Sequence, residues 1–129
     1  MAGLYLHVPF CRQACHYCDF HFSTNVQNME PMVQAILEEA RIRSDSVAGW
    51  GQKTFQTLYL GGGTPSLLEG DQLKTLVNGV LAALNVEASS LQEVTLEANP
   101  EDIAPEKVEA WLEAGICLLY TSDAADELC

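Results

Sequence analysis

Residues 4–18, LYLHVPFCRQACHYC, join a short apolar segment to a concentrated group of cysteines. The segment 4–8 is apolar and rich in residues that favour strands, and Pro9 ends it, so a strand is predicted there. Residues 9–28 are polar and aromatic without a helical period, which predicts a loop. Three of the five cysteines of the chain lie in this loop: Cys11, Cys15 and Cys18.

The rest of the chain alternates predicted helices and strands. Helical spacing of apolar residues begins at Met29, again at Leu73, and again near Pro105, a residue favoured in a first helical turn. The segments FQTLYL (55–60) and EVTLEA (93–98) predict two more strands. The apolar residues expected on the buried helix faces are Met32, Val33, Ile36, Leu37 and Ala40, then Leu73, Leu76, Val77, Val80, Leu81 and Leu84, then Val108, Trp111 and Leu112. This order predicts an α/β fold with a parallel sheet.

Three unusual segments fall at the ends of the predicted strands. The cysteine loop follows the first strand, GGGTPS (61–66) follows the second, and Glu97 and Asn99 end the third. Ligands of parallel α/β folds bind at the carboxyl ends of the strands. We therefore expect all three segments to contribute to one binding site at this edge of the sheet.

The glycine segment and Glu97 each have a structural and a functional interpretation. Consecutive glycines allow a tight turn, or they let a ligand approach the backbone closely. No Lys-Ser or Lys-Thr follows them, which excludes a phosphate-binding P-loop. A carboxylate in the otherwise apolar strand of Glu97 is costly unless it faces solvent at the sheet edge or a cation.

Length, charge and composition limit the classes of function. The 129 residues are enough for one domain, and the net charge of −12, with only six Lys and Arg, argues against a nucleic-acid partner. No run of apolar residues is long enough to cross a membrane, and the N-terminus lacks the features of a signal peptide. A reducing, cytoplasmic location is therefore expected.

The cysteine spacing C-x3-C-x2-C allows several chemistries. A zinc site would need a fourth ligand, which His7, His16 or His21 could supply, whereas a disulfide would leave the third thiol unpaired. A [4Fe–4S] cluster with three cysteine ligands would leave one iron open for chemistry. We favour the cluster over zinc because no second pair of ligands is visible in the sequence.

Three segments together resemble the radical S-adenosylmethionine (SAM) superfamily: LYLHVPFCRQACHYCDFHF (4–22), YLGGGTPSLL (59–68) and LEANPEDI (96–103). Within it they are similar to the branch of oxygen-independent coproporphyrinogen III oxidases and a related haem chaperone. The resemblance runs from about Leu4 to Ile116. It implies the N-terminal part of a partial (β/α)6 TIM-like barrel, with about three βα units present.

The resemblance also implies cofactors and residue roles. Cys11, Cys15 and Cys18 would bind a [4Fe–4S] cluster, and the amino and carboxylate groups of SAM would chelate its open iron. A reduced cluster would then cleave SAM to methionine and a 5′-deoxyadenosyl radical. The residues expected to contact SAM are Tyr5, Tyr17, Gly62, Gly63, Thr64 and Glu97. The three histidines are expected to have structural roles and not to be ligands.

The sequence after the third cysteine favours one member of the branch. The oxidases carry a further cysteine two positions later, whereas this chain has Asp19 and Phe20. We therefore favour haem binding and delivery, with haem, a haem-acceptor protein and an electron donor as partners. The alternatives are an oxidase that decarboxylates coproporphyrinogen III in haem biosynthesis and a small zinc-binding interaction module. Whether the protein is an enzyme stays open at this point.

The last thirteen residues, CLLYTSDAADELC (117–129), differ from the rest. They resemble the in-frame translation of a sequencing-library adapter and depart from the family pattern. We expect residues 1–116 to be the N-terminal portion of a radical SAM core domain and residues 117–129 to be non-biological. An apolar stretch there could still pair with the sheet. A fragment of this kind is expected to be marginally stable, to lack several of the SAM contacts, and to be unable to bind haem as the full-length protein does.

Overall fold

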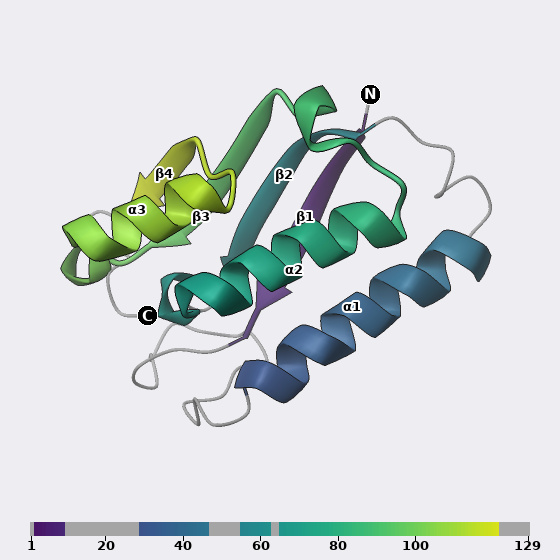
Figure 1. The fold of residues 1–129 in the computed structure, drawn as a ribbon, viewed down its shortest axis with the longest axis horizontal. Helices are drawn as coiled ribbons and strands as arrows, with labels where there is room; N and C mark the ends of the chain where they lie inside the picture. Colours follow the sequence, from purple (N-terminus) through teal and green to yellow (C-terminus); the bar gives the residue numbers. More distant parts are fainter. Residues whose placement is uncertain (1, 10–28, 47–54, 63–64, 122–129) are drawn as a thin grey trace.

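Four parallel strands form one sheet in the computed structural model, which describes residues 2–9, 29–46, 55–62 and 65–121 (Figure 1). The strands lie in the sequential order β1 (Ala2–Val8), β2 (Phe55–Gly62), β3 (Glu93–Ala98) and β4 (Leu118–Thr121). The α-helices of the described residues are α1 (Met29–Ser46), α2 (Gly70–Ala83) and α3 (Pro105–Glu113). Short 3-10 helices lie at η3 (Pro65–Leu67), η4 (Ala88–Ser90) and η5 (Pro100–Asp102). The predicted α/β fold with a parallel sheet is confirmed.

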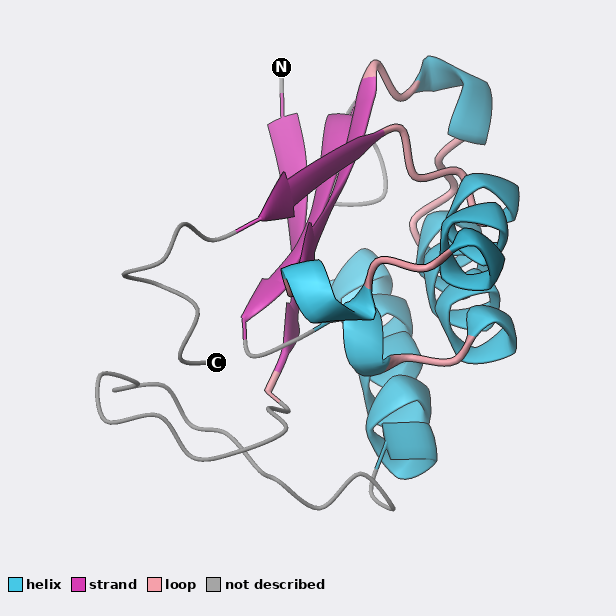
Figure 2. Cartoon of the chain, turned by 90° about the vertical axis from the view of Figure 1, so that its left-hand side faces the viewer, coloured by secondary structure: helices cyan, strands magenta, loops and turns pink. Residues whose placement is uncertain are grey.

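The α-helices lie on one face of the sheet, as Figure 2 shows from the side. Along β1 the side chains alternate, because Leu4, Leu6 and Val8 are buried whereas Tyr5 is exposed. Successive side chains of a strand point to opposite faces, so the first three face the helices and Tyr5 faces away. No helix of the described residues covers the face that carries Tyr5, which we call the open face.

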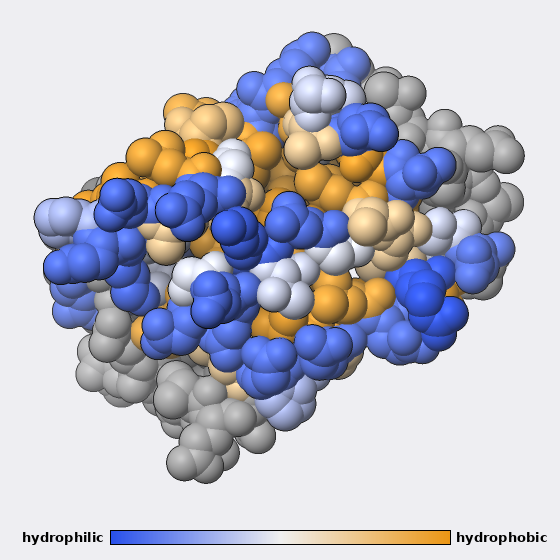
Figure 3. Space-filling view, viewed as in Figure 1, coloured by the Kyte–Doolittle hydropathy of each residue, from blue (hydrophilic) through white to orange (hydrophobic). Residues whose placement is uncertain are grey.

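The core fills the space between the sheet and the helices. Leu58, Leu60 and Leu96 of the central strands are fully buried. The predicted face of α2 is confirmed in full. Of the predicted face of α1, Val33 and Ala40 are buried in the core, and Met32, Ile36 and Leu37 are partly buried. Figure 3 shows hydrophilic residues along the outer surfaces of the helices, with apolar residues visible between them. None of the described helices is both long and apolar enough to cross a lipid bilayer.

The predicted inner face of α3 is partly wrong. Trp111 is buried and Val108 is partly buried, but the side chain of Leu112 is 64% exposed. Ala114 is buried instead. Each residue turns a helix by about 100°, so Leu112 lies well round the helix from Trp111, whereas Ala114 lies near it. The helix is rotated so that Trp111 and Ala114 face the core, and Leu112 faces outward.

Strand β4 lies within residues 117–129, the segment expected to be non-biological. It pairs in parallel with β3, with Thr95 opposite Leu118 and Glu97 opposite Tyr120. The side chains of Leu118, Leu119 and Tyr120 are all exposed at this edge of the sheet. An apolar segment is expected to pair with an open strand whatever its origin, so the expectation for residues 117–129 stays a prediction.

Candidate functional site

The carboxyl ends of β1, β2 and β3 meet at one edge of the sheet, as the sequence predicts. Val8 pairs with Gly62 at the ends of β1 and β2, and Leu60 pairs with Leu96 just before the end of β3. The cysteine segment follows β1 in the sequence. However, six of the predicted site residues lie outside the described residues, and their roles stay predictions: Cys11, Cys15, Tyr17, Cys18, Gly63 and Thr64.

The carboxylate of Glu97 is held by two donors from the neighbouring strand. The hydroxyl of Tyr59 donates a hydrogen bond of 2.6 Å to Oε2, and the backbone N–H of Gly62 donates one of 3.0 Å to Oε1. Both bonds are partly buried. Hydrogen bonds to a charged acceptor are stronger than neutral ones, so these two fix the orientation of the carboxylate. The sequence left two environments for this carboxylate, the edge of the sheet or a cation. The two hydrogen bonds place it at the edge of the sheet.

The first two glycines of the GGG segment make room for this arrangement. A Cβ atom on Gly61 would lie 2.8 Å from the ring of Tyr59 and 2.9 Å from Oε1 of Glu97. Gly62 has φ +112°, a conformation that residues with a side chain rarely adopt. A Cβ there would lie 2.8 Å from the carbonyl oxygen of Val8. Glycine is thus required at position 62 by backbone conformation and contact, whereas at position 61 a side chain would displace Tyr59 and Glu97 from their present arrangement.

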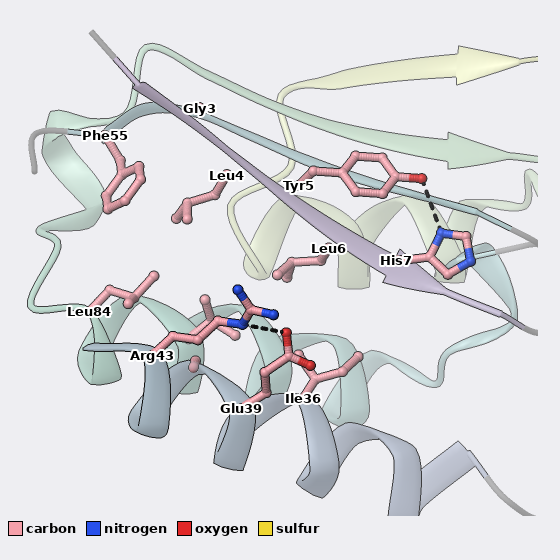
Figure 4. Close-up of a pocket in the computed structure, with 12 residues that line it drawn as sticks. Gly3, Leu4, Tyr5, Leu6, His7, Ile36, Glu39, Arg43, Phe55 and Leu84 are labelled. Carbon is pink, nitrogen blue, oxygen red and sulfur yellow. Dashed lines mark hydrogen bonds and ion pairs between the residues drawn. The ribbon is translucent and has the colours of Figure 1, made fainter. Parts of the chain in front are cut away.

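Two tyrosines form an aromatic surface beside the carboxylate. The rings of Tyr5 and Tyr59 stack with centroids 5.8 Å apart and planes 17° apart. The hydroxyl of Tyr5 lies 3.3 Å from Nδ1 of His7 along β1 (Figure 4). Burial, followed by the negative charge of Glu97, raises the pKa of Tyr5. The open face therefore presents protonated phenols and one oriented carboxylate near the carboxyl ends of the strands.

This arrangement suits a ligand with a positive charge and a flat apolar part. The carboxylate can accept further hydrogen bonds from a cationic group, since each oxygen has two lone pairs. Within the described ranges, no group of three or more His, Cys, Asp or Glu side chains is placed to hold a metal ion. The predicted cluster thus depends on the cysteine segment that lies outside those ranges.

A separate cavity of about 410 Å³ lies between β1 and α1 (Figure 4). It is lined mainly by apolar residues, among them Leu4, Ile36 and Leu84, and Glu97 does not line it. Its charged lining residues, Glu39 and Arg43, form an ion pair with a 2.9 Å separation. Tyr5 and His7 also line the cavity, so it adjoins the site at the strand ends without including its carboxylate.

Tyr59 and Gly61 are part of the site but were not among the predicted residues. The local sequence of β2 marks Tyr59 only as a strand former. The signal that could have identified it is alternation, since Tyr59 and Gly61 share a face of β2. With the pairing of Tyr59 to Thr95 in β3, that face is the one that carries Glu97.

The stability of the chain is expected to depend on Tyr59 at alkaline pH. Burial first, and then the hydrogen bond and charge of Glu97, raise the pKa of Tyr59 well above its ordinary value near 10. The unfolded state then loses its tyrosine proton at a lower pH than the folded state does. The contribution of Tyr59 to the free energy of unfolding is therefore full below about pH 10, and it declines as the pH rises further.

Urea unfolding at pH 8 and pH 11 tests this dependence. The difference in free energy of unfolding between the wild-type chain and Tyr59→Phe is expected to be smaller at pH 11. An equal difference at the two pH values would show that Tyr59 ionises alike in the folded and unfolded states.

Comparisons with known proteins show the family to which this chain belongs. The sequence matches the radical SAM superfamily over residues 5–123. It is 37% identical over 117 residues to the heme chaperone HemW of Bacillus subtilis (strain 168), covering 90% of this chain and 30% of that protein. It is 36% identical over 116 residues to the heme chaperone HemW of Escherichia coli (strain K12), covering 88% of this chain and 29% of that protein.

A solved structure agrees with the sequence matches. The coproporphyrinogen III oxidase HemN from Escherichia coli, a radical SAM enzyme, superposes with a TM-score of 0.73 at 26% identity. The superposition covers 92% of this chain and 27% of that chain. The chain therefore belongs to the radical SAM superfamily, and its sheet and helices form part of a radical SAM α/β fold. It spans about 30% of the length of the curated HemW relatives that it matches.

Proposed function

We propose that this chain is the segment of a radical SAM haem chaperone that binds a [4Fe–4S] cluster and SAM. The observation that carries the proposal is the carboxylate of Glu97, which is oriented by the backbone of Gly62 at the strand ends. In the sequence the cysteine segment starts just after β1 reaches this same edge. A cationic cofactor and a thiolate-bound cluster would therefore lie next to one another.

The residues of the chain fit both cofactors chemically. Three thiolates at C-x3-C-x2-C spacing are a suitable ligand set for a cluster that keeps one iron open. SAM carries an amino group, which can donate a hydrogen bond to the Glu97 carboxylate, and a positive sulfonium, which the carboxylate attracts electrostatically. The absent side chain at Gly61 lets the carboxylate and the ring of Tyr59 lie close to the backbone of β2. When bound, the reduced cluster supplies one electron to the sulfonium of SAM.

Each predicted residue has a defined task in this proposal. The thiolates of Cys11, Cys15 and Cys18 hold the cluster. Glu97 attracts the sulfonium of SAM and accepts a hydrogen bond from its amino group, and the exposed ring of Tyr5 packs against the cofactor. The remaining contacts are assigned to the glycine segment and the cysteine segment: Gly62, Gly63, Thr64 and Tyr17.

Haem delivery is favoured over oxidation of a porphyrinogen. The relatives at 37% and 36% identity are named heme chaperones. Phe20, which follows Asp19, stands where the oxidases have a further cysteine. The second candidate, an oxygen-independent coproporphyrinogen III oxidase, is supported by the similarity of the fold to HemN. The proposed partners are haem, a haem-acceptor protein and an electron donor, in the cytoplasm.

The two candidates differ in a test on a full-length protein that contains this segment. We expect the protein to bind haem and to pass it to an apo-form haem protein, detected as the absorption spectrum of the loaded acceptor. Under anaerobic conditions with SAM and a reductant, coproporphyrinogen III is expected to remain unchanged. Its decarboxylation would establish the oxidase instead, and a protein that neither transfers haem nor turns over the porphyrinogen would contradict both candidates.

A further inference from the structure

Tyr59 has a contact that no prediction from the sequence assigned. Its hydroxyl donates a 2.6 Å hydrogen bond to Oε2 of Glu97, across from β2 to β3. The other carboxylate oxygen, Oε1, accepts the backbone N–H of Gly62 at 3.0 Å. One donor from a side chain and one from the backbone therefore hold the two oxygens of the same carboxylate.

The neighbours of Tyr59 keep its ring in position. On one side the ring stacks on Tyr5 from β1, with the ring planes 17° apart. Toward the end of β2, the missing side chain of Gly61 leaves space that a Cβ would fill at 2.8 Å from the ring. The ring is thus packed so that its hydroxyl reaches the carboxylate.

Without Tyr59, the side chain of Glu97 would lose one of its two constraints. A glutamate side chain has three rotatable bonds, and a single hydrogen bond to Oε1 leaves the second oxygen to be oriented by solvent. Ordering a flexible side chain at the moment of binding weakens the binding of its ligand. A carboxylate that is oriented beforehand avoids this loss.

We propose that Tyr59 is a positioning residue whose hydroxyl holds the carboxylate of Glu97 in the orientation that accepts a positively charged group of SAM. The proposal rests on the proposed function, because it takes SAM as the ligand. Tyr59 acts through Glu97 and makes no contact with SAM in this account. Its contribution therefore exists only while position 97 carries a carboxylate.

A double-mutant cycle on the reconstituted full chain tests this dependence, with SAM binding measured by isothermal titration calorimetry. Tyr59→Phe is expected to weaken SAM binding about five- to tenfold, less than the loss of a direct hydrogen bond to a charged group, because Tyr59 acts through Glu97. In the Glu97→Gln background, the same substitution is expected to cause no further weakening. The control Tyr120→Phe changes a tyrosine opposite Glu97 in β4 and is expected to leave binding unchanged.

Several outcomes would overturn the proposal. Equal weakening by Tyr59→Phe in both backgrounds would indicate a structural role that does not pass through Glu97, and so would equal weakening by the Tyr120→Phe control. Unchanged binding in Tyr59→Phe would show that the hydroxyl is dispensable. These results leave the proposed function intact if the wild-type chain binds SAM, whereas a reconstituted wild-type chain that does not bind SAM would overturn both.

Discussion

Replacement of Gly62 by alanine is expected to lower the free energy of unfolding by about 2–5 kcal/mol, from backbone strain and a new clash combined. Gly62 has φ +112°. The new Cβ would lie 2.8 Å from the carbonyl oxygen of Val8 and 2.9 Å from the ring of His7. Because Val8 and Gly62 are paired in the sheet, the clash can be relieved only by separating the ends of β1 and β2.

Gly115→Ala is the matched control for this substitution. Gly115 also has a positive φ, +98°, but a Cβ there would meet nothing within 4 Å. Gly115→Ala is expected to lower the free energy of unfolding by about 1–3 kcal/mol, because only the backbone strain is present there. Urea unfolding of both variants gives the comparison. Equal losses for the two variants would show that the contact with Val8 contributes nothing.

Replacement of Glu97 by glutamine is expected to weaken SAM binding about 10- to 100-fold and to change the free energy of unfolding by less than about 1 kcal/mol. The amide oxygen can still accept the N–H of Gly62, and the amide NH2 can donate to the hydroxyl of Tyr59. Both bonds of the carboxylate to its neighbours therefore have a replacement. The negative charge that faces the ligand, however, is lost without a replacement.

Calorimetric titration with SAM and urea unfolding measure the two effects separately. The control is Glu93→Gln, which removes an exposed carboxylate from the start of β3, at the opposite end of the strand. It is expected to bind SAM as the wild-type chain does. Undiminished binding by Glu97→Gln would exclude Glu97 from the SAM site, and equal weakening in both variants would indicate a general effect of charge.

Much of the fold could be predicted because burial follows a simple period. In β1 the buried residues Leu4, Leu6 and Val8 alternate with exposed or partly buried ones. In α2 every predicted inner residue is buried. When one side of a helix or strand must be buried, a repeated apolar pattern shows which side that is. The alternation of strands and helices then fixes a parallel sheet.

The rotation of α3 was not predictable from the same kind of pattern. Its short sequence has apolar residues on more than one side, so the choice between Leu112 and Ala114 depends on how the helix packs. Contacts with the rest of the fold place Trp111 and Ala114 inside. A large apolar side chain can therefore stay exposed while a small one is buried.

The candidate site was predictable in position but not in its contacts. The local sequence shows that the carboxyl ends of the strands are unusual, and that Glu97 needs a partner. It does not show that the partner is Tyr59, because that contact depends on the register between β2 and β3. Residues 38 positions apart are brought together only by the sheet.

Metal and sulfide analysis of the chain after anaerobic reconstitution with iron and sulfide tests the central claim most directly. About four irons and four sulfides per wild-type chain are predicted, with a loss of both in Cys→Ala variants at positions 11, 15 and 18. Cys117→Ala, which changes an exposed thiol after α3, is the control and should keep the full content. One tightly bound zinc without sulfide would contradict the account.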